Sequence, residues 1–246
     1  MALFTDGPAS TIEDLAAQDS QLLDVASVEG IDLTRKLALA QEAVAIDLEA
    51  VMRRVGNGPA RMGHVVVTPA LRLWHTYRAL ELAYGDAYYS QLNDRYAAKR
   101  DRFADLAKWA HERLILTGIG MAPRPVPRAV PPDVAAAPGA VPDGTYYVTM
   151  AWLNSTGEEG AAAVPAVVTT SGSSFLVTPK TAPAAASGWN VYAGPAPDSM
   201  VRQNDAAIAP GGTWLQPAMV RAAGDAPGHG QAPSYFHALP RVVQRG

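Results

Sequence analysis

The chain has 246 residues, of which 48% are hydrophobic, so it is long enough to bury the core of one or two domains. It contains no cysteine, which excludes thiol catalysis, thiolate metal ligands and disulfide bonds. The formal net charge is only −3, without the basic excess of a protein that grips nucleic acid through its phosphates.

The two halves of the chain differ in composition. Residues 1–120 contain 13 Lys and Arg and 16 Asp and Glu, whereas residues 121–246 contain 7 of each and are rich in Pro, Gly, Ala, Thr and Val. The second composition is typical of short strands and turns. We therefore predict an α+β multidomain chain. We find no secretory signal and no membrane-spanning stretch, and expect a soluble chain made in the cytoplasm.

The N-terminal region predicts three helices before the longest one. Ser10 and Glu13 have the spacing of a capping box, which predicts a short helix over residues 11–20. Apolar residues at steps of three and four predict a second helix over residues 32–55. A Thr-Pro pair at residues 68–69 marks the start of a third, because Thr caps helices and Pro fits their first position.

Residues 86–117 predict one long amphipathic helix of about 45 Å, around which the rest of the chain is organised. An alternative is a single helix over residues 69–117, kinked at Gly85. The stripe expected to be buried consists of Tyr89, Leu92, Tyr96, Phe103, Leu106, Ala110 and Leu114. The charged residues between them have mixed signs, which suits water or a neighbouring subunit.

The sequence divides into four predicted parts. Residues 1–120 form a helical bundle domain, and the proline-rich residues 121–142 form an extended spacer. Residues 143–220 contain six or seven short strands, typical of an antiparallel β-sandwich of the fibronectin type III or immunoglobulin kind. Residues 221–246 form an extended C-terminal arm whose apolar side chains need a surface to bury against.

Groups that could carry chemistry are sparse. The pair Glu158 and Glu159 lies beside a turn, which favours a solvated loop. Three aspartates of the long helix have Arg or Lys neighbours, which favours salt bridges over metal binding: Asp94, Asp101 and Asp105. The histidines form no close ligand pair: His64, His75, His111, His229 and His237. We expect no enzymatic activity, no cofactor and no metal.

Two sets of segments together resemble virion proteins of tailed bacteriophages. STIEDLAAQDSQLL and LWHTYRALELAYGDAYYSQLNDRYAAKRDRFADLAKWAHERLILTGIGMAPRPVPRA resemble the helical head-to-tail adaptor, or head completion, proteins below the portal. TYYVTMAWLNSTGEEGAAAVP, GWNVYAGPAPDSMVRQN and TWLQP resemble the fibronectin type III-like modules of phage structural proteins. The smallest adaptors lack such a module.

The resemblance implies a structural protein of the virion neck. Such adaptors form a homo-oligomeric ring, commonly a dodecamer, which binds the portal protein and docks a tail, stopper or nozzle protein. Genomic DNA passes through the ring without sequence-specific binding, and no membrane is involved. The implied subunit or channel contacts are Arg95, Lys99, Arg100, Arg102 and Asp105. The implied docking arm, toward the portal or a neighbouring subunit, carries Tyr235, Phe236, Leu239, Arg241 and Arg245.

A second class of function stays open. The chain could be a phage tail or fibre accessory protein whose β-sandwich binds a partner or a carbohydrate. Exposed aromatic residues on sandwich loops would favour this, but Trp189 and Trp214 lie in strand contexts that predict core positions. Stoichiometry separates the classes, because a twelvefold ring supports the adaptor and a trimer supports the fibre.

Overall fold

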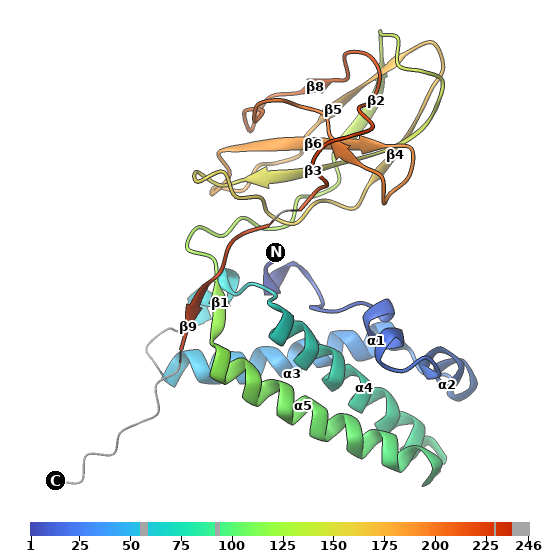
Figure 1. The fold of residues 1–246 in the computed structure, drawn as a ribbon, viewed down its shortest axis with the longest axis vertical. Helices are drawn as coiled ribbons and strands as arrows, with labels where there is room; N and C mark the ends of the chain where they lie inside the picture. Colours follow the sequence, from blue (N-terminus) through green and yellow to red (C-terminus); the bar gives the residue numbers. More distant parts are fainter. Residues whose placement is uncertain (55–58, 92–93, 229, 238–246) are drawn as a thin grey trace, which may run out of the picture. The chain divides into compact units, whose positions relative to one another are not determined.

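The computed structural model describes residues 1–54, 59–91, 94–228 and 230–237 (Figure 1). The chain forms two compact units. The helical unit consists of Gly7–Met121 and Ser234–Gly246, and the β unit of Met1–Asp6 and Ala122–Pro233. The first six residues, predicted as part of the helical domain, therefore belong to the β unit, and the separate arm predicted over residues 221–246 is divided between the two units. The coarse prediction of an α+β chain is confirmed, with five α-helices and antiparallel sheets in the described residues.

The helices come first along the chain. Their bounds are η1 (Phe4–Asp6), α1 (Ile12–Gln18), α2 (Leu22–Glu29), α3 (Leu33–Arg54), η2 (Pro59–His64), α4 (Pro69–Gln91), η3 (Asp94–Tyr96) and α5 (Ala97–Thr117). In the part of the chain that the structure describes, no helix is long and apolar enough to cross a membrane.

The capping box of α1 lies one residue later than predicted. Thr11 is the N-cap, and its hydroxyl accepts a hydrogen bond from the Asp14 backbone N–H at 3.2 Å. The Asp14 carboxylate in turn accepts from the Thr11 N–H at 2.8 Å. Ser10 is 3% exposed, and its hydroxyl bonds the ring of His75 at 2.6 Å. Because the Ser10 hydroxyl is bonded to His75, it does not cap the helix, and Thr11 is the N-cap instead.

The single long helix predicted over residues 86–117 is wrong, and so is the kink at Gly85. The fourth helix continues through Gly85 and ends at Gln91, and a separate fifth helix begins at Ala97. The two helices pack along each other (Figure 1). Tyr84 stacks on Phe103 with ring centroids 5.6 Å apart. A hairpin lets both apolar faces bury each other, at about 1.5–3 kcal/mol for each large side chain.

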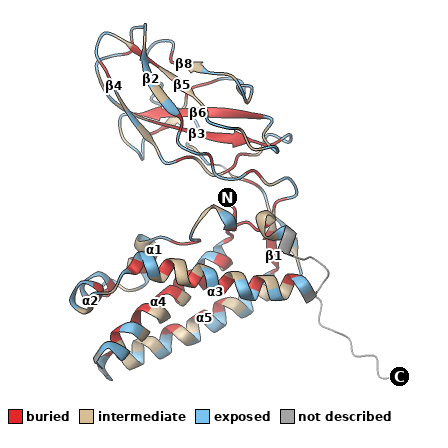
Figure 2. Ribbon diagram, turned by 180° about the vertical axis from the view of Figure 1, so that it is seen from behind, coloured by how far each residue is buried: buried red, intermediate tan, exposed pale blue. Residues whose placement is uncertain are grey.

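Helix α4 is the centre of the helical unit. It contacts α1, α2, α3 and α5. Figure 2 shows buried residues along its length and along the inner faces of its neighbours. Fully buried large side chains of this core are Leu15, Leu22, Leu48, Met52, Leu71, Leu80, Tyr84 and Leu114. The unit is therefore organised around residues 69–91 rather than around residues 86–117.

A two-stranded sheet completes the helical unit. Strand β1 (Ile119–Met121) pairs antiparallel with β9 (Ser234–Phe236). Gly118, with φ of 92°, joins α5 to β1; a Cβ there would lie 3.0 Å from the Phe236 carbonyl oxygen. The extended arm predicted over residues 221–246 is thus wrong for residues 234–236, because their backbone hydrogen bonds are made to β1.

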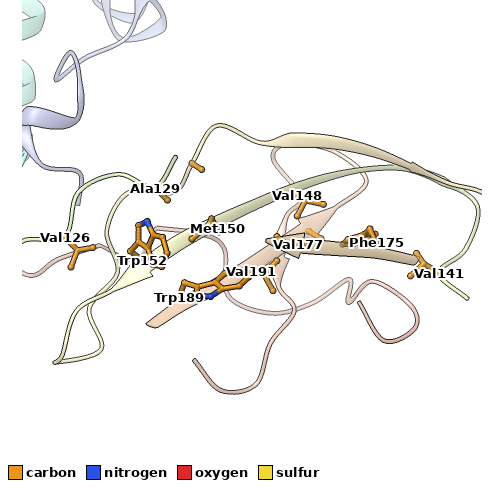
Figure 3. Close-up of a cluster of buried hydrophobic side chains, with 12 residues drawn as sticks. Val126, Ala129, Val141, Val148, Met150, Trp152, Phe175, Val177, Trp189 and Val191 are labelled. Atoms are coloured by element: carbon orange, nitrogen blue, oxygen red, sulfur yellow. The ribbon is translucent and has the colours of Figure 1, made fainter. Parts of the chain in front are cut away.

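Among the described residues, the β unit contains seven strands in two antiparallel sheets. The strands are β2 (Asp133–Ala137), β3 (Gly144–Leu153), β4 (Ala166–Thr170), β5 (Ser174–Thr178), β6 (Gly188–Gly194), β7 (Val201–Arg202) and β8 (Trp214–Leu215). The sheet orders are β2-β5-β8 and β4-β3-β6-β7. Side chains from both sheets share one core, in which Trp189 and Phe175 are fully buried (Figure 3). Every residue of β6 is buried (Figure 2).

Most of the proline-rich segment belongs to the β unit, so the spacer predicted over residues 121–142 is wrong. Its residues 133–137 form β2, which pairs with β5. Val126 and Val141 lie in the core of the unit (Figure 3). Gln231, far along the chain, hydrogen-bonds the backbone of Val126. Its side-chain amide accepts from the Val126 N–H at 2.7 Å and donates to the Val126 carbonyl at 3.0 Å. Valines between the prolines supply burial that a free spacer would lack.

Candidate subunit interface and polar pocket

The outward face of α5 carries an exposed stripe of mixed character. Arg102, Asp105, Trp109, Arg113 and Leu116 follow one another at steps of three and four, which places them on one side of the helix. All five are exposed, Trp109 to 44% and Leu116 to 68%. The Arg113 guanidinium lies over the Trp109 ring at 5.7 Å. We call these residues the α5 stripe.

Lys99 is occupied inside the subunit. Its ammonium group contacts the Asp19 carboxylate at 2.7 Å and the Tyr84 hydroxyl at 3.2 Å. The Tyr84 hydroxyl donates to the same carboxylate at 2.6 Å. Burial acts to raise the pKa of Asp19, but the hydrogen bonds from Lys99 and Tyr84 outweigh it, and the pKa is lowered. Burial, followed by the bond to Asp19, raises the pKa of Tyr84.

Arg95 and Arg100 are also engaged with aromatic rings of the helical unit. The Arg95 guanidinium lies 4.6 Å from the ring centre of Tyr96, whose hydroxyl donates to Glu29 at 2.9 Å. The Arg100 guanidinium lies 4.4 Å from the ring centre of Tyr88. The Tyr96–Glu29 bond ties the start of α5 to α2, and the Arg100–Tyr88 contact ties α5 to α4. Of the five predicted contact residues, Arg102 and Asp105 lie on the α5 stripe, whereas Arg95, Lys99 and Arg100 each contact groups of their own helical unit.

The predicted docking arm is described only in part. Tyr235 and Phe236 lie in β9, where Phe236 pairs with Ile119, and Tyr235 is 51% exposed. Leu239, Arg241 and Arg245 lie outside the described residues.

The β unit contains a polar pocket of about 470 Å³. It is lined by Leu153, Gly157, Glu158, Glu159, Asn190, Tyr192, Arg202, Ala207, Asp225 and Gly230. Glu159 is only 7% exposed, so the prediction of a solvated loop is wrong for this residue. It follows the turn after β3 and pairs with Leu153 through an isolated β-bridge. We call this the polar pocket.

A chain of hydrogen bonds fixes the Glu159 carboxylate. Its Oε1 atom accepts from the Asn190 amide and from the Tyr192 hydroxyl, two residues on the same face of β6. The Asn190 side chain accepts from the Asn204 amide at 2.8 Å, and Asn204 accepts from the Val191 N–H at 2.9 Å. Burial, followed by the bond to Glu159, raises the pKa of Tyr192. The carboxylate is therefore held in one orientation.

Two buried polar atoms of the pocket residues have no hydrogen-bond partner among the described residues. They are Oε2 of Glu159 and Nε of Arg202. Glu158, by contrast, accepts from Asn154, Thr156 and the Ala232 N–H. The α-ammonium group of Met1 interacts electrostatically with Glu158 and Glu159. Their negative charges act to raise its pKa, but burial has the larger effect and the pKa is lowered.

Sequence reasoning missed the pocket because its residues come from four separate segments. It also missed Trp109 and Leu116, although their spacing from Arg102 and Asp105 is visible in the sequence. Within the described residues, no group of three or more His, Asp or Glu side chains is placed to hold a metal ion. A scan against models of known protein families finds no match, and a search of curated proteins finds no similar sequence.

Proposed function

We propose that this chain is a structural protein of a tailed-bacteriophage virion, a head-to-tail adaptor. In this proposal it forms a ring, commonly twelvefold, below the portal protein. The ring extends the channel for genomic DNA and offers a docking surface to the tail or to a stopper protein. The observation that carries the proposal is the α5 stripe, which is exposed on a compact helical unit.

The composition of the α5 stripe supports contact with a second copy of the chain. Trp109, which is 44% exposed, and Leu116, which is 68% exposed, supply the apolar surface that the centre of an interface buries. Arg102, Asp105 and Arg113 supply charges of both signs around it, so a neighbour with mixed charges is accommodated. A head-to-tail contact of this kind, repeated with a closing rotation, generates a ring.

Two further features support the proposed role of an adaptor in the virion neck. Residues 1–120 carry 16 acidic and 13 basic side chains, a slight acidic excess that lets DNA slide without being held. The β unit has two antiparallel sheets around a shared core, as in the fibronectin type III-like modules that the sequence resembles. We assign it to that class as an accessory module of the adaptor.

The test compares two charge reversals on one helix. Arg102→Glu alters the α5 stripe, whereas Lys108→Glu alters an exposed cation of α5 outside the stripe. Each purified chain is mixed with portal rings from the same phage and analysed by sedimentation and negative-stain electron microscopy. We expect the wild type and Lys108→Glu to co-sediment and to add ring density, and Arg102→Glu to lose both while its circular dichroism stays unchanged. Absence of ring density with the wild type, or equal loss in both variants, would contradict the proposal.

The polar pocket favours the second candidate function, a tail or fibre accessory protein whose sandwich binds a partner or carbohydrate. Its buried, oriented Glu159 and its volume of about 470 Å³ are features of a ligand site. Oligomeric state distinguishes the two candidates. Light scattering that gives a trimer, with no ring on portal particles, favours the accessory protein.

A further inference from the structure

We propose that the polar pocket of the β unit binds a small zwitterionic compound, whose ammonium group contacts Glu159 and whose carboxylate contacts Arg202. The proposal is independent of the ring, because every residue of the pocket lies in the β unit. It follows from the presence, in one pocket, of two oppositely charged side chains that each have a buried atom without a partner.

The glutamate side of the pocket is built to receive a donor. Glu159 is more than nine-tenths buried, and both hydrogen bonds that hold it, from Asn190 and Tyr192, are made to Oε1. Oε2 is therefore the oxygen left for a ligand. A buried carboxylate oxygen without a donor is unfavourable, and an ammonium group of a ligand would supply the missing hydrogen bond.

The arginine side of the pocket is built to receive an acceptor. The backbone N–H of Arg202 donates to the Asp225 carbonyl at 2.9 Å, and its Nη2 donates to the Asp205 carbonyl at 3.3 Å. The first bond fixes the backbone and the second orients the guanidinium, while Nε–H has no acceptor among the described residues. A carboxylate is the strongest acceptor for this group.

The charges of the lining decide between ligand classes. A polyol would satisfy both hydrogen bonds but neither charge, and a simple anion would be repelled by Glu158, Glu159 and Asp225. A simple cation would leave Arg202 Nε without its acceptor. Leu153 and Ala207 provide apolar surface for the carbon chain between the two charges.

The experiment uses a ladder of zwitterions with increasing charge separation. Glycine, β-alanine, γ-aminobutyrate and 5-aminopentanoate are each titrated into the full chain by isothermal titration calorimetry. We expect saturable binding with an optimum at one chain length. Butylamine, butyrate and glycerol, which each lack one or both charges, should bind at least about tenfold more weakly than the best zwitterion.

Three variants complete the test. Glu159→Gln keeps the shape and the Oε1 acceptor but replaces Oε2 by a donor, and Arg202→Met removes Nε–H; each should weaken binding about tenfold or more. Asp133→Asn, an exposed carboxylate of β2 outside the pocket, should bind like the wild type. Circular dichroism checks folding, and if Glu159→Gln does not fold, Arg202→Met decides. No saturable binding across the ladder, glycerol or butylamine binding as tightly as the best zwitterion, or unchanged binding by Arg202→Met would overturn the proposal.

Discussion

Acidification should destabilise the helical unit through one residue, His75. This side chain is fully buried on α4, with Nε2 3.1 Å from the Leu37 carbonyl oxygen and Nδ1 2.6 Å from the Ser10 hydroxyl. A carbonyl only accepts, so Nε2 carries the proton, and Nδ1 accepts from Ser10. The neutral ring satisfies both partners, whereas a protonated ring would place a positive charge in the buried core.

The magnitude follows from the pKa. Burial lowers the pKa of His75 from 6.5 to about 4, against the hydrogen bond to Leu37 and the charge of Asp14. Because the folded state resists protonation, the contribution is fully present above pH 6.5, falls as the pH decreases toward about 4, and is constant below that. At about 1.4 kcal/mol per pH unit the difference corresponds to about 3 kcal/mol of unfolding free energy.

The measurement is urea unfolding at about pH 7 and about pH 4.5, followed by far-UV circular dichroism, which reports the helices. The matched variant His75→Gln keeps a donor and an acceptor but does not titrate. We expect the wild type to lose about 2–3 kcal/mol more than the variant over this range. Asp19, whose pKa is lowered, contributes its own loss only when the pH falls below its ordinary value of 3.8. Equal losses in both proteins would refute the role given to His75.

Three further predictions concern stability. Trp189→Ala empties a fully buried site and should cost the β unit about 3–5 kcal/mol, measured by amide hydrogen exchange of its strands, without changing the exchange of the helices; a loss below about 1 kcal/mol would contradict the packing. Gly194→Ala would place a Cβ 2.5 Å from the Ser199 carbonyl oxygen and should lower the melting temperature of the β unit, whereas an unchanged melting temperature would contradict the close approach. Lys99→Met leaves Asp19 without its cation and should destabilise the helical unit by about 1–3 kcal/mol, an effect that Asp19→Asn should reduce in the double mutant; simple addition of the two effects would show that the pair is not coupled.

Local signals predicted the regular elements well. The helix predicted over residues 32–55 is α3, Leu33–Arg54, and the predicted start at Pro69 is confirmed. The GWNVYAG segment is β6, Gly188–Gly194. These elements could be predicted because hydrophobic spacing and capping or turn residues agree within a short window.

Long-range contacts explain what the sequence did not reveal. The apolar stripe predicted over residues 86–117 is divided between two helices, which pack on each other through contacts such as Tyr84 on Phe103. Helical spacing of apolar residues does not show where the chain turns back, because both helices have the same period. Ser10 and Thr11 are both good caps, and only the distant His75 decides between them.

The candidate sites show the same limit. Glu159 reads as a solvated turn residue, and only the pairing of β3 with β6 brings Asn190 and Tyr192 against it. Lys99 is predicted as a subunit or channel contact, but Asp19, far away in sequence, gives it a partner within the same subunit. The role of a polar residue whose partner lies on a distant element cannot be predicted from its local sequence.

Electron microscopy of the chain bound to portal rings tests the proposed adaptor function most directly. We expect added ring density on one end of the portal, lost with Arg102→Glu and kept with Lys108→Glu. A portal particle without added density, or a free trimer of the chain, would contradict an adaptor.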